Sequence, residues 1–310
     1  MKIITDLADK IQKDGWMLRD ILLEQHKYHE SRRWSVDEII QKHNNNPEAH
    51  IFSVEDKAAL WHVTRGEATT QPGGISIAVN ANELANEYAS SNKTAEVIFK
   101  ALEAWLVRHW LNEEGHHEVG FSMLADMANI EKISDKELIQ HKQFFPADKI
   151  GRKLILQACV EIEVTISYSH MVKNSKNPLI KEMFRAVQKD ESQHRLYFIS
   201  FAKALVDIGV VPVKDILSMA YSWVRSGGDT YNTERKNVPK RDGYINWWES
   251  VDSNSGYKMD EKQYKNNKIH KQKETSVFQL VRFITDIRVN NISDLKKAYL
   301  SSLKQTKKVA

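Results

Sequence analysis

The chain has 310 residues, of which 41% are apolar and 28% are charged, and its net charge is only +4. This length suits one large domain with a deep core, and 12 glycines with 6 prolines favour long helices over a turn-rich β fold. The single Cys159 excludes a disulfide framework and any zinc or iron–sulfur site made of cysteines, so we expect a cytoplasmic protein. The sequence shows no secretory signal and no apolar run of about 18 residues, so we expect no transmembrane segment.

Helical periodicity dominates the first half of the chain. Residues 1–30 are predicted to form a helix, and residues 31–74 are mixed, with turn signals in NNNPE and, more strongly, in TTQPGG. From Ile75 to about Met127 the pattern is again helical, with a break near Ser90–Lys93 where Asn92 or Thr94 could cap the next helix. We therefore predict a helical hairpin over residues 75–127.

The second half repeats this organisation. The predicted features are a loop around Phe145–Pro146, a helix over 151–172, a turn at NSKNP, helices over 179–208 and 213–224, an exposed loop over 225–243 and a helix over 275–304. No strand pattern stands out. We predict an all-α protein in one domain: an N-terminal segment (1–74) packed on a bundle (75–224), followed by a basic extension (225–310) that contains Trp247 and Trp248.

The first motif with metal-binding character lies in WLVRHWLNEEGHHEVGF. A Glu-x-x-His pair shares one helix face, and here the pair is either Glu113/His116 or Glu114/His117. The apolar stripe that continues after the motif favours Glu114 and His117. One such pair on a helix is common by chance.

A second pair, Glu191 and His194, lies on an apolar stripe of the helix predicted over 179–208. Burying an ionised carboxylate there costs several kcal/mol, and a bound dication removes that cost. A di-iron helical bundle requires two Glu-x-x-His helices and one glutamate from each of two other helices. The sequence therefore predicts a ferritin-like four-helix di-iron bundle with additional N- and C-terminal helices.

Two further glutamates are needed to complete such a site, and each predicted hairpin offers two. Glu83 and Glu87 compete on the first helix, and we select Glu83. Glu161 and Glu163 compete on the third, and we select Glu163, which shares a face with apolar residues. Oxygen and nitrogen ligands without thiolate suit iron, with manganese as the alternative.

The motifs resemble those of the soluble acyl-carrier-protein desaturases. VRHWLNEEGHH resembles that family's Arg-x-Trp-x-x-Glu-Glu-x-x-His element, and KDESQH resembles its Asp-Glu-x-x-His element. The helix from Glu163 to His170 is similar to the family's third-ligand helix, and ESRRWSVDEI to the segment that carries a tryptophan on the electron path, here Trp34.

The resemblance implies an oxidoreductase of fatty acid metabolism that uses dioxygen. Its metal ligands would be Glu83, Glu114, His117, Glu163, Glu191 and His194. Asp190 would accept a hydrogen bond from a ligand histidine, and Trp34 would help to deliver electrons from ferredoxin or a similar donor. The substrate would be an acyl chain on an acyl carrier protein, entering an apolar tunnel lined by residues such as Phe121, Met123, Leu124, Phe198 and Phe201. A homodimer is expected, and no nucleic acid partner.

The chain also departs from the family. Where the family commonly has a threonine three residues after the third ligand, this chain has Ile166, with Thr165 beside it as the candidate for proton delivery. The Lys-rich C-terminal tail matches no part of the family. A hydroxylase or N-oxygenase is therefore the alternative, and a non-enzymatic ferritin-like iron-binding protein is the alternative of another class. A radical-tyrosine reductase subunit is disfavoured, because Phe121 stands four residues after His117.

Overall fold

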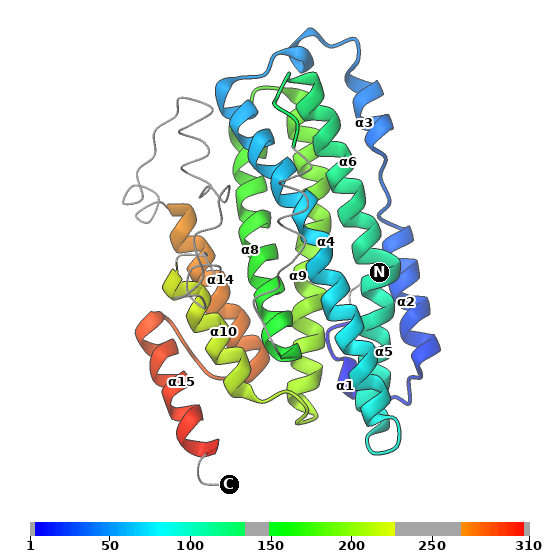
Figure 1. The fold of residues 1–310 in the computed structure, drawn as a ribbon, viewed down its shortest axis with the longest axis vertical. Coiled ribbons are helices and arrows are strands. Elements are labelled where there is room, and N and C mark those ends of the chain that lie inside the picture. The colour runs from blue at the N-terminus through cyan, green and yellow to red at the C-terminus, as the bar shows by residue number, and fades with distance from the viewer. Residues whose placement is uncertain (1–3, 134–148, 227–267, 307–310) are drawn as a thin grey trace.

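The computed structural model describes residues 4–133, 149–226 and 268–306, and all the regular elements in these ranges are helices. Four long helical segments lie lengthwise beside one another (Figure 1). They are α4 (Val54–Tyr88), α6 (Leu111–Met127), α8 (Ile150–Asn174) and α9 (Pro178–Asp207). Helix α4 packs on α6 and α8, and α9 packs on both α6 and α8, so the four segments surround one interior.

Helix α4 forms the first hairpin with a second long helical run. This run consists of α5 (Lys93–Trp105), a π-helical turn η2 (Leu106–Trp110) and α6. The predicted break near Ser90 is confirmed, and Asn92 caps α5 by accepting a hydrogen bond from the backbone N–H of Ala95. π-Helical turns are often found at functional sites, and this one directly precedes the Glu-x-x-His motif.

The turn predicted at TTQPGG is wrong, because α4 runs through it. At Gly74 the missing side chain leaves room for a neighbouring indole ring. A methyl group on Gly74 would overlap the ring of Trp110, so the indole packs directly on the backbone of α4. This tertiary contact outweighs the poor helix propensity of proline and glycine. As a consequence the first bundle helix begins at Val54, before the predicted boundary at residue 75.

The second hairpin agrees closely with the prediction. Helices α8 and α9 are joined by three residues, and Asn177 caps α9 by accepting hydrogen bonds from the N–H groups of Leu179 and Ile180. Pro178 occupies the first helical position, where its missing N–H costs nothing.

Shorter helices cover the bundle on two sides (Figure 1). The predicted helix over residues 1–30 is two helices, α1 (Leu7–Gln12) and α2 (Leu18–Glu30), separated at Gly15, whose φ of 70° suits glycine. Helix α3 (Val36–His43) and the short 3₁₀ helix η1 (Pro47–His50) follow. Helix α10 (Val213–Ser226) is as predicted, whereas the helix over 275–304 is two helices, α14 (Lys268–Thr285) and α15 (Ile292–Thr306).

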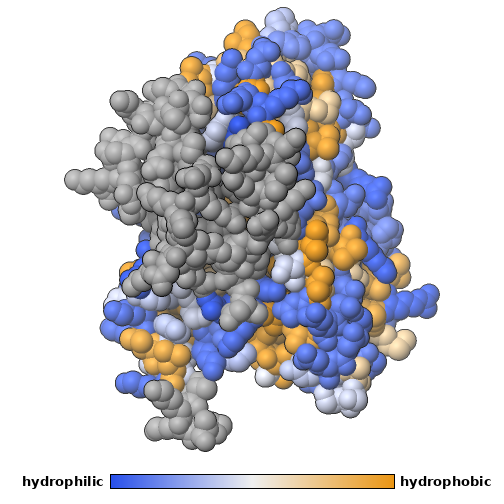
Figure 2. All heavy atoms as spheres, in the orientation of Figure 1, coloured by the Kyte–Doolittle hydropathy of each residue, from blue (hydrophilic) through white to orange (hydrophobic). Residues whose placement is uncertain are grey.

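The predicted loops around Phe145–Pro146 and over 225–243, and Trp247 and Trp248, lie outside the described residues. In Figure 2 the described residues in view are mostly hydrophilic, with apolar side chains in small groups between them. None of the described helices is both long and apolar enough to cross a membrane.

The interior holds two apolar clusters with a polar layer between them. On the run formed by η2 and α6, Trp110 belongs to one cluster and Phe121 to the other, and on α9 Val187 and Phe198 are divided in the same way. Glu114, His117, Glu191 and His194 lie between these residues along the two helices. Both Glu-x-x-His motifs therefore point into a polar layer enclosed by apolar packing.

Candidate metal centre

Six buried side chains form the polar layer, and they come from all four long helical segments. Glu67 comes from α4, Glu114 and His117 from α6, Glu161 from α8, and Glu191 and His194 from α9. None is more than 4% exposed. This arrangement matches the general pattern predicted from the motifs: two Glu-x-x-His pairs and one glutamate from each of two further helices.

The six residues form two overlapping groups that could each hold a metal ion. The first group is Glu67, Glu114, His117 and Glu191, and the second is Glu114, Glu161, Glu191 and His194; in each group the ligand atoms lie within 4.8 Å of one another. Glu114 and Glu191 belong to both groups. They are therefore placed to bridge two ions, while each group keeps its own histidine and its own further glutamate.

The histidines are oriented by carboxylates outside the cluster. His117 directs Nε2 to Oδ2 of Asp190 at 3.2 Å, and His194 directs Nε2 to Oε2 of Glu113 at 2.8 Å. The Nδ1 atoms therefore face the cluster. Nδ1 of His194 lies 3.0 Å from Glu191 and 3.1 Å from Glu114, and Nδ1 of His117 lies 3.4 Å from Glu191. Such outer partners fix the orientation and tautomer of a metal-binding imidazole.

Several polar atoms at the centre of the cluster lack hydrogen bonds. Oε2 of Glu67 and Nδ1 of His117 are buried and form no hydrogen bond within the part of the chain that the structure describes. Buried polar atoms are rarely left without a partner, and a bound metal ion would satisfy these two. The donor set of carboxylates and imidazoles also suits hard to borderline divalent ions.

The electrostatics of the cluster also favour a bound cation. Burial, followed by repulsion from neighbouring carboxylates, raises the pKa values of Glu67, Glu114 and Glu161. Burial alone would lower the pKa values of His117 and His194, but the surrounding carboxylates raise both well above the usual range. Without a cation the cluster therefore holds extra protons, and a dication could replace them.

Glu114 and His117, the pair selected for the first motif, both belong to the buried cluster. The alternative pair has other partners. Glu113 bridges His194 and His29, with Nδ1 of His29 at 2.6 Å from Oε1 of Glu113, and its pKa is lowered: burial opposes this, but hydrogen bonds from the two histidines prevail. His116 is half-buried and lies against the ring of Trp34.

The structure does not bring Glu83 or Glu163 to the cluster, and this corrects two of the selected ligands. Glu83 and Glu87 are both exposed near the end of α4. Glu83 lies 16 residues after Glu67, about 24 Å away along a helix. Glu163 instead accepts a hydrogen bond of 2.8 Å from Lys273 of α14.

On α8 the sequence contained a signal that favoured Glu161 over the selected Glu163. Polar residues recur there at helical spacing, as Gln157, Glu161, Thr165 and Tyr168. Glu161 accepts hydrogen bonds from Nε2 of Gln157 at 3.0 Å and from Nε1 of Trp110 at 3.3 Å. Glu67 gave no such signal, because the proline and glycines that follow it obscured its helix.

The predicted residues around the ligands have mixed outcomes. Trp34 donates a hydrogen bond from Nε1 to Oδ2 of Asp190 at 2.6 Å, and the same oxygen lies 3.2 Å from Nε2 of His117, so Asp190 connects the two rings. Thr165 lies one helical turn after Glu161, and its buried Oγ1 has no hydrogen-bond partner among the described residues. Most of the expected tunnel residues are packed in the core: Phe121, Leu124, Phe198 and Phe201 are buried, whereas Met123 is 36% exposed.

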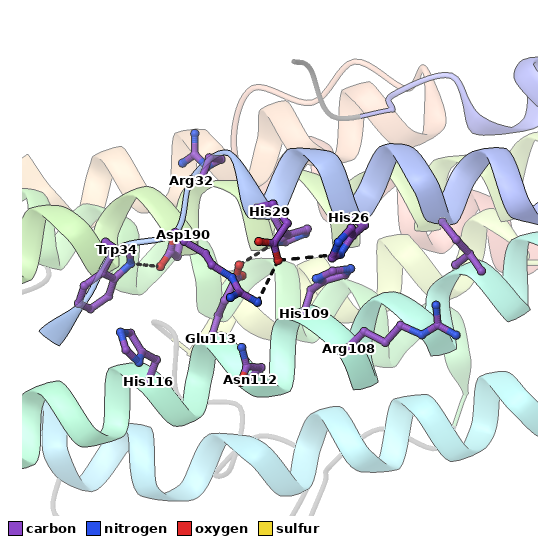
Figure 3. A pocket seen from close by; sticks show the side chains of 13 residues that line it. His26, His29, Arg32, Trp34, Arg108, His109, Asn112, Glu113, His116 and Asp190 are labelled. Atoms are coloured by element: carbon purple, nitrogen blue, oxygen red, sulfur yellow. Dashed lines mark hydrogen bonds and ion pairs between the residues drawn. The ribbon is translucent and has the colours of Figure 1, made fainter.

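A polar cleft of about 760 Å³ opens beside the cluster, on the side of Asp190 and Glu113 (Figure 3). Its lining includes Trp34 and is rich in cationic and imidazole side chains, namely His26, His29, Arg32, Arg33, Arg108, His109 and His116. The rings of His29 and His109 are stacked there, with centroids 4.3 Å apart. The cleft thus reaches the carboxylates that orient both cluster histidines, but not the cluster itself.

No model of a protein family matches the chain, and neither a curated protein nor a solved structure is significantly similar to it. The function of the buried cluster is therefore inferred from its own residues and their geometry.

Proposed function

We propose that the protein is a dioxygen-dependent oxidase of the ferritin-like di-iron class. The observation that carries the proposal is the pair of overlapping groups, which share Glu114 and Glu191. This sharing is what a carboxylate-bridged pair of ions requires. Iron is the first choice among the metals that accept oxygen and imidazole ligands, with manganese as the alternative.

The protein's own residues would divide the work as follows. Glu114 and Glu191 would bridge the ions; Glu67 with His117 would complete one site, and Glu161 with His194 the other. Asp190 and Glu113 would hold the two imidazoles with Nδ1 toward the ions. Bound iron would supply the electrons that activate dioxygen.

Electron supply is the role proposed for Trp34. Its indole lies close to parallel to the His117 ring, with centroids 6.2 Å apart and planes inclined by 14°, and it shares the Asp190 carboxylate with that ring. Trp34 also lines the open cleft, so a ferredoxin or a similar donor could reach it from outside. These contacts support an electron path from the cleft through Trp34 toward His117.

For the substrate, we retain an acyl chain carried by acyl carrier protein as the proposal, with hydroxylation or N-oxygenation as the alternative oxidation. Support comes from the motifs and from the position of Thr165. With Glu161 as the ligand, the Thr165 hydroxyl lies on the ligand's own helix face, where it could hold a proton for the reaction. Assembly as a homodimer and a cytoplasmic location stay part of this proposal.

The first experiment measures metal content. Purified protein reconstituted with ferrous iron without oxygen should hold close to two ions per chain. Glu67→Gln and Glu161→Gln should each lower this number, whereas the matched changes Glu83→Gln and Glu163→Gln should leave it unchanged. Protein that binds no iron would refute the proposal, and equal effects in both pairs would refute the ligand assignment.

A second experiment tests the reaction. Oxygen consumption with a reductant and a panel of acyl carrier proteins should exceed consumption with free fatty acids, and mass spectrometry of the product identifies the oxidation. Loss of two mass units indicates desaturation, and gain of one oxygen indicates hydroxylation. Iron binding without oxygen consumption under any condition would favour an iron-binding protein without enzymatic activity.

A further inference from the structure

Trp105 contacts the metal cluster at His194, through a different set of contacts from those by which Trp34 contacts His117. It is the last residue of α5, directly before the π-helical turn, and its side chain is fully buried. Its ring meets the His194 ring edge-on, with centroids 6.2 Å apart. The second cluster histidine therefore has a tryptophan in ring contact, as His117 has in Trp34.

The indole N–H of Trp105 is hydrogen-bonded to a residue that can accept a proton. Nε1 of Trp105 donates to Nε2 of His29 at 3.1 Å. Because Nε2 of His29 accepts this N–H, the proton of the neutral imidazole is on Nδ1, which lies 2.6 Å from Oε1 of Glu113. Trp34 is different, because its N–H is bonded to Asp190, which already serves His117.

Aromatic rings continue from Trp105 toward the surface. Tyr197 is stacked on Trp105 with centroids 4.8 Å apart, and Tyr28 meets Tyr197 edge-on at 6.1 Å. Tyr28 is buried and lies under the guanidinium of Arg32, 5.3 Å from its ring, and Arg32 lines the cleft. The three rings therefore form a series from the cluster to a residue of the cleft.

We propose that Trp105 is a redox-active residue that discharges the oxidised metal pair when no substrate is present, with His29 as the acceptor of its proton. This inference rests on the proposed function. Trp105 would give one electron to the dioxygen-oxidised metal pair, and its N–H proton would move to Nε2 of His29, leaving a neutral indolyl radical. An external one-electron donor such as ascorbate would then return the electron by way of Tyr28 and Tyr197, and the proton would return from His29.

The tryptophan and its histidine suit this step physically. A buried Trp would need only a hydrogen-bond acceptor for stability, and a backbone carbonyl would serve. An imidazole lone pair can also take the proton itself, which makes removal of the electron easier. Since Glu113 accepts the Nδ1–H of His29, it would stabilise the imidazolium that results.

The test uses iron-loaded full-length protein, mixed with dioxygen in the absence of substrate and frozen at short times. Electron paramagnetic resonance should detect a neutral tryptophanyl radical, identified by the change in its spectrum when the protein contains ring-deuterated tryptophan. Trp105→Phe should abolish this signal, and Trp34→Phe should retain it. In His29→Gln, which keeps a hydrogen-bond acceptor but cannot take the proton, the radical should be lost or appear in its protonated, cationic form.

Iron content is measured in every variant, so that loss of metal is not mistaken for loss of the radical. A signal that disappears in Trp34→Phe but persists in Trp105→Phe would overturn the inference, as would a tyrosyl radical that only Tyr168→Phe removes. Metal that is oxidised by dioxygen without any radical would overturn the inference and leave the proposed function standing. Failure to bind iron would end both.

A second readout follows the lifetime of the protein. During repeated exposure to dioxygen with ascorbate but without substrate, Trp105→Phe should accumulate more oxidised side chains near the cluster than the unchanged protein, as measured by peptide mass spectrometry. Equal damage in the two proteins would argue against a discharging role.

Discussion

The phenol of Tyr168 donates a hydrogen bond of 2.6 Å to Oε1 of Glu67, and both residues are buried. The other oxygen, Oε2, is buried and has no hydrogen-bond partner among the described residues. Tyr168 thus orients one of the two glutamates that come from helices without a Glu-x-x-His motif.

Tyr168→Phe should weaken metal binding in the group that contains Glu67. Loss of an outer hydrogen bond to a ligand typically costs about 10- to 100-fold in metal affinity. Titration of apo-protein with ferrous iron should therefore show one weakened site per chain and one that is little changed. Tyr88→Phe, in a half-buried ring that packs on Phe99, is the matched control and should leave both sites intact.

Asp190→Asn should impair the position of His117. The carboxylate of Asp190 faces Nε2 of His117 and Nε1 of Trp34 with the same oxygen, and an amide accepts hydrogen bonds less strongly. A decrease in metal affinity of about 10- to 100-fold is expected from isothermal titration. Asp37→Asn, on an exposed site of α3, should have no effect. An unchanged affinity in Asp190→Asn would show that His117 is oriented by packing alone.

Gly74→Ala should destabilise the protein, because the added methyl group would overlap the ring of Trp110. Overpacking of this kind costs about 1–3 kcal/mol, measured as the free energy of unfolding in urea. Iron binding should weaken as well, since Trp110 donates its N–H to Glu161.

Gly66→Ala is the control for that change. Gly66 lies in the same helix, and nothing lies within 4 Å of an added methyl group there. Removing a glycine from a helix interior should stabilise the protein by roughly 0.5–1 kcal/mol. If both substitutions were stabilising, close contact between Gly74 and Trp110 would not exist in solution.

The stability of the metal-free protein should fall as pH rises. The pKa values of Glu67 and Glu161 are raised by burial and by neighbouring carboxylates, and those of His117 and His194 are raised, against burial, by the cluster glutamates. Groups with raised pKa values bind more protons in the folded state than in the unfolded state. The stability that they contribute is complete below the pKa of the unfolded state, which is 4.5 for glutamate and 6.5 for histidine. It is lost as the pH rises from that value through the pKa of the folded state. Glu191 has a lowered pKa because the two histidines outweigh its burial, so the stability that it contributes is complete above 4.5 and is lost only as the pH falls below that value.

Thermal unfolding of chelator-treated protein should therefore show a melting temperature that decreases from about pH 5 to about pH 8. Protein loaded with a divalent ion should show a smaller decrease, since the ion takes the place of the protons. In the variant carrying both Glu67→Gln and Glu161→Gln, the decrease should be reduced even without metal. A melting temperature that rises over this range would mean that the cluster is not protonated in the folded state.

The sequence by itself determined the helical class, the break near Ser90 with Asn92 as one of its two candidate caps, and the turn at NSKNP, and its apolar stripe favoured Glu114 and His117 in the first Glu-x-x-His motif. These features depend on neighbours within one or two turns, and local periodicity and capping chemistry record them. The extent of α4 was not determined in this way, because the local signal of proline and glycine was overruled by the packing of Trp110 on Gly74.

The remaining two glutamates were decided by the tertiary structure. In an antiparallel hairpin, residues equally far from the turn lie at the same level. Glu67 precedes Ser90 by 23 residues and Glu114 follows it by 24, whereas Glu83 precedes it by only 7. About the turn at Lys176, Glu161 and Glu191 are both 15 residues away. The count about Lys176 could be made from the predicted turn, whereas the count about Ser90 requires α4 to be known as one continuous helix, so only the folded structure places Glu67 level with Glu114.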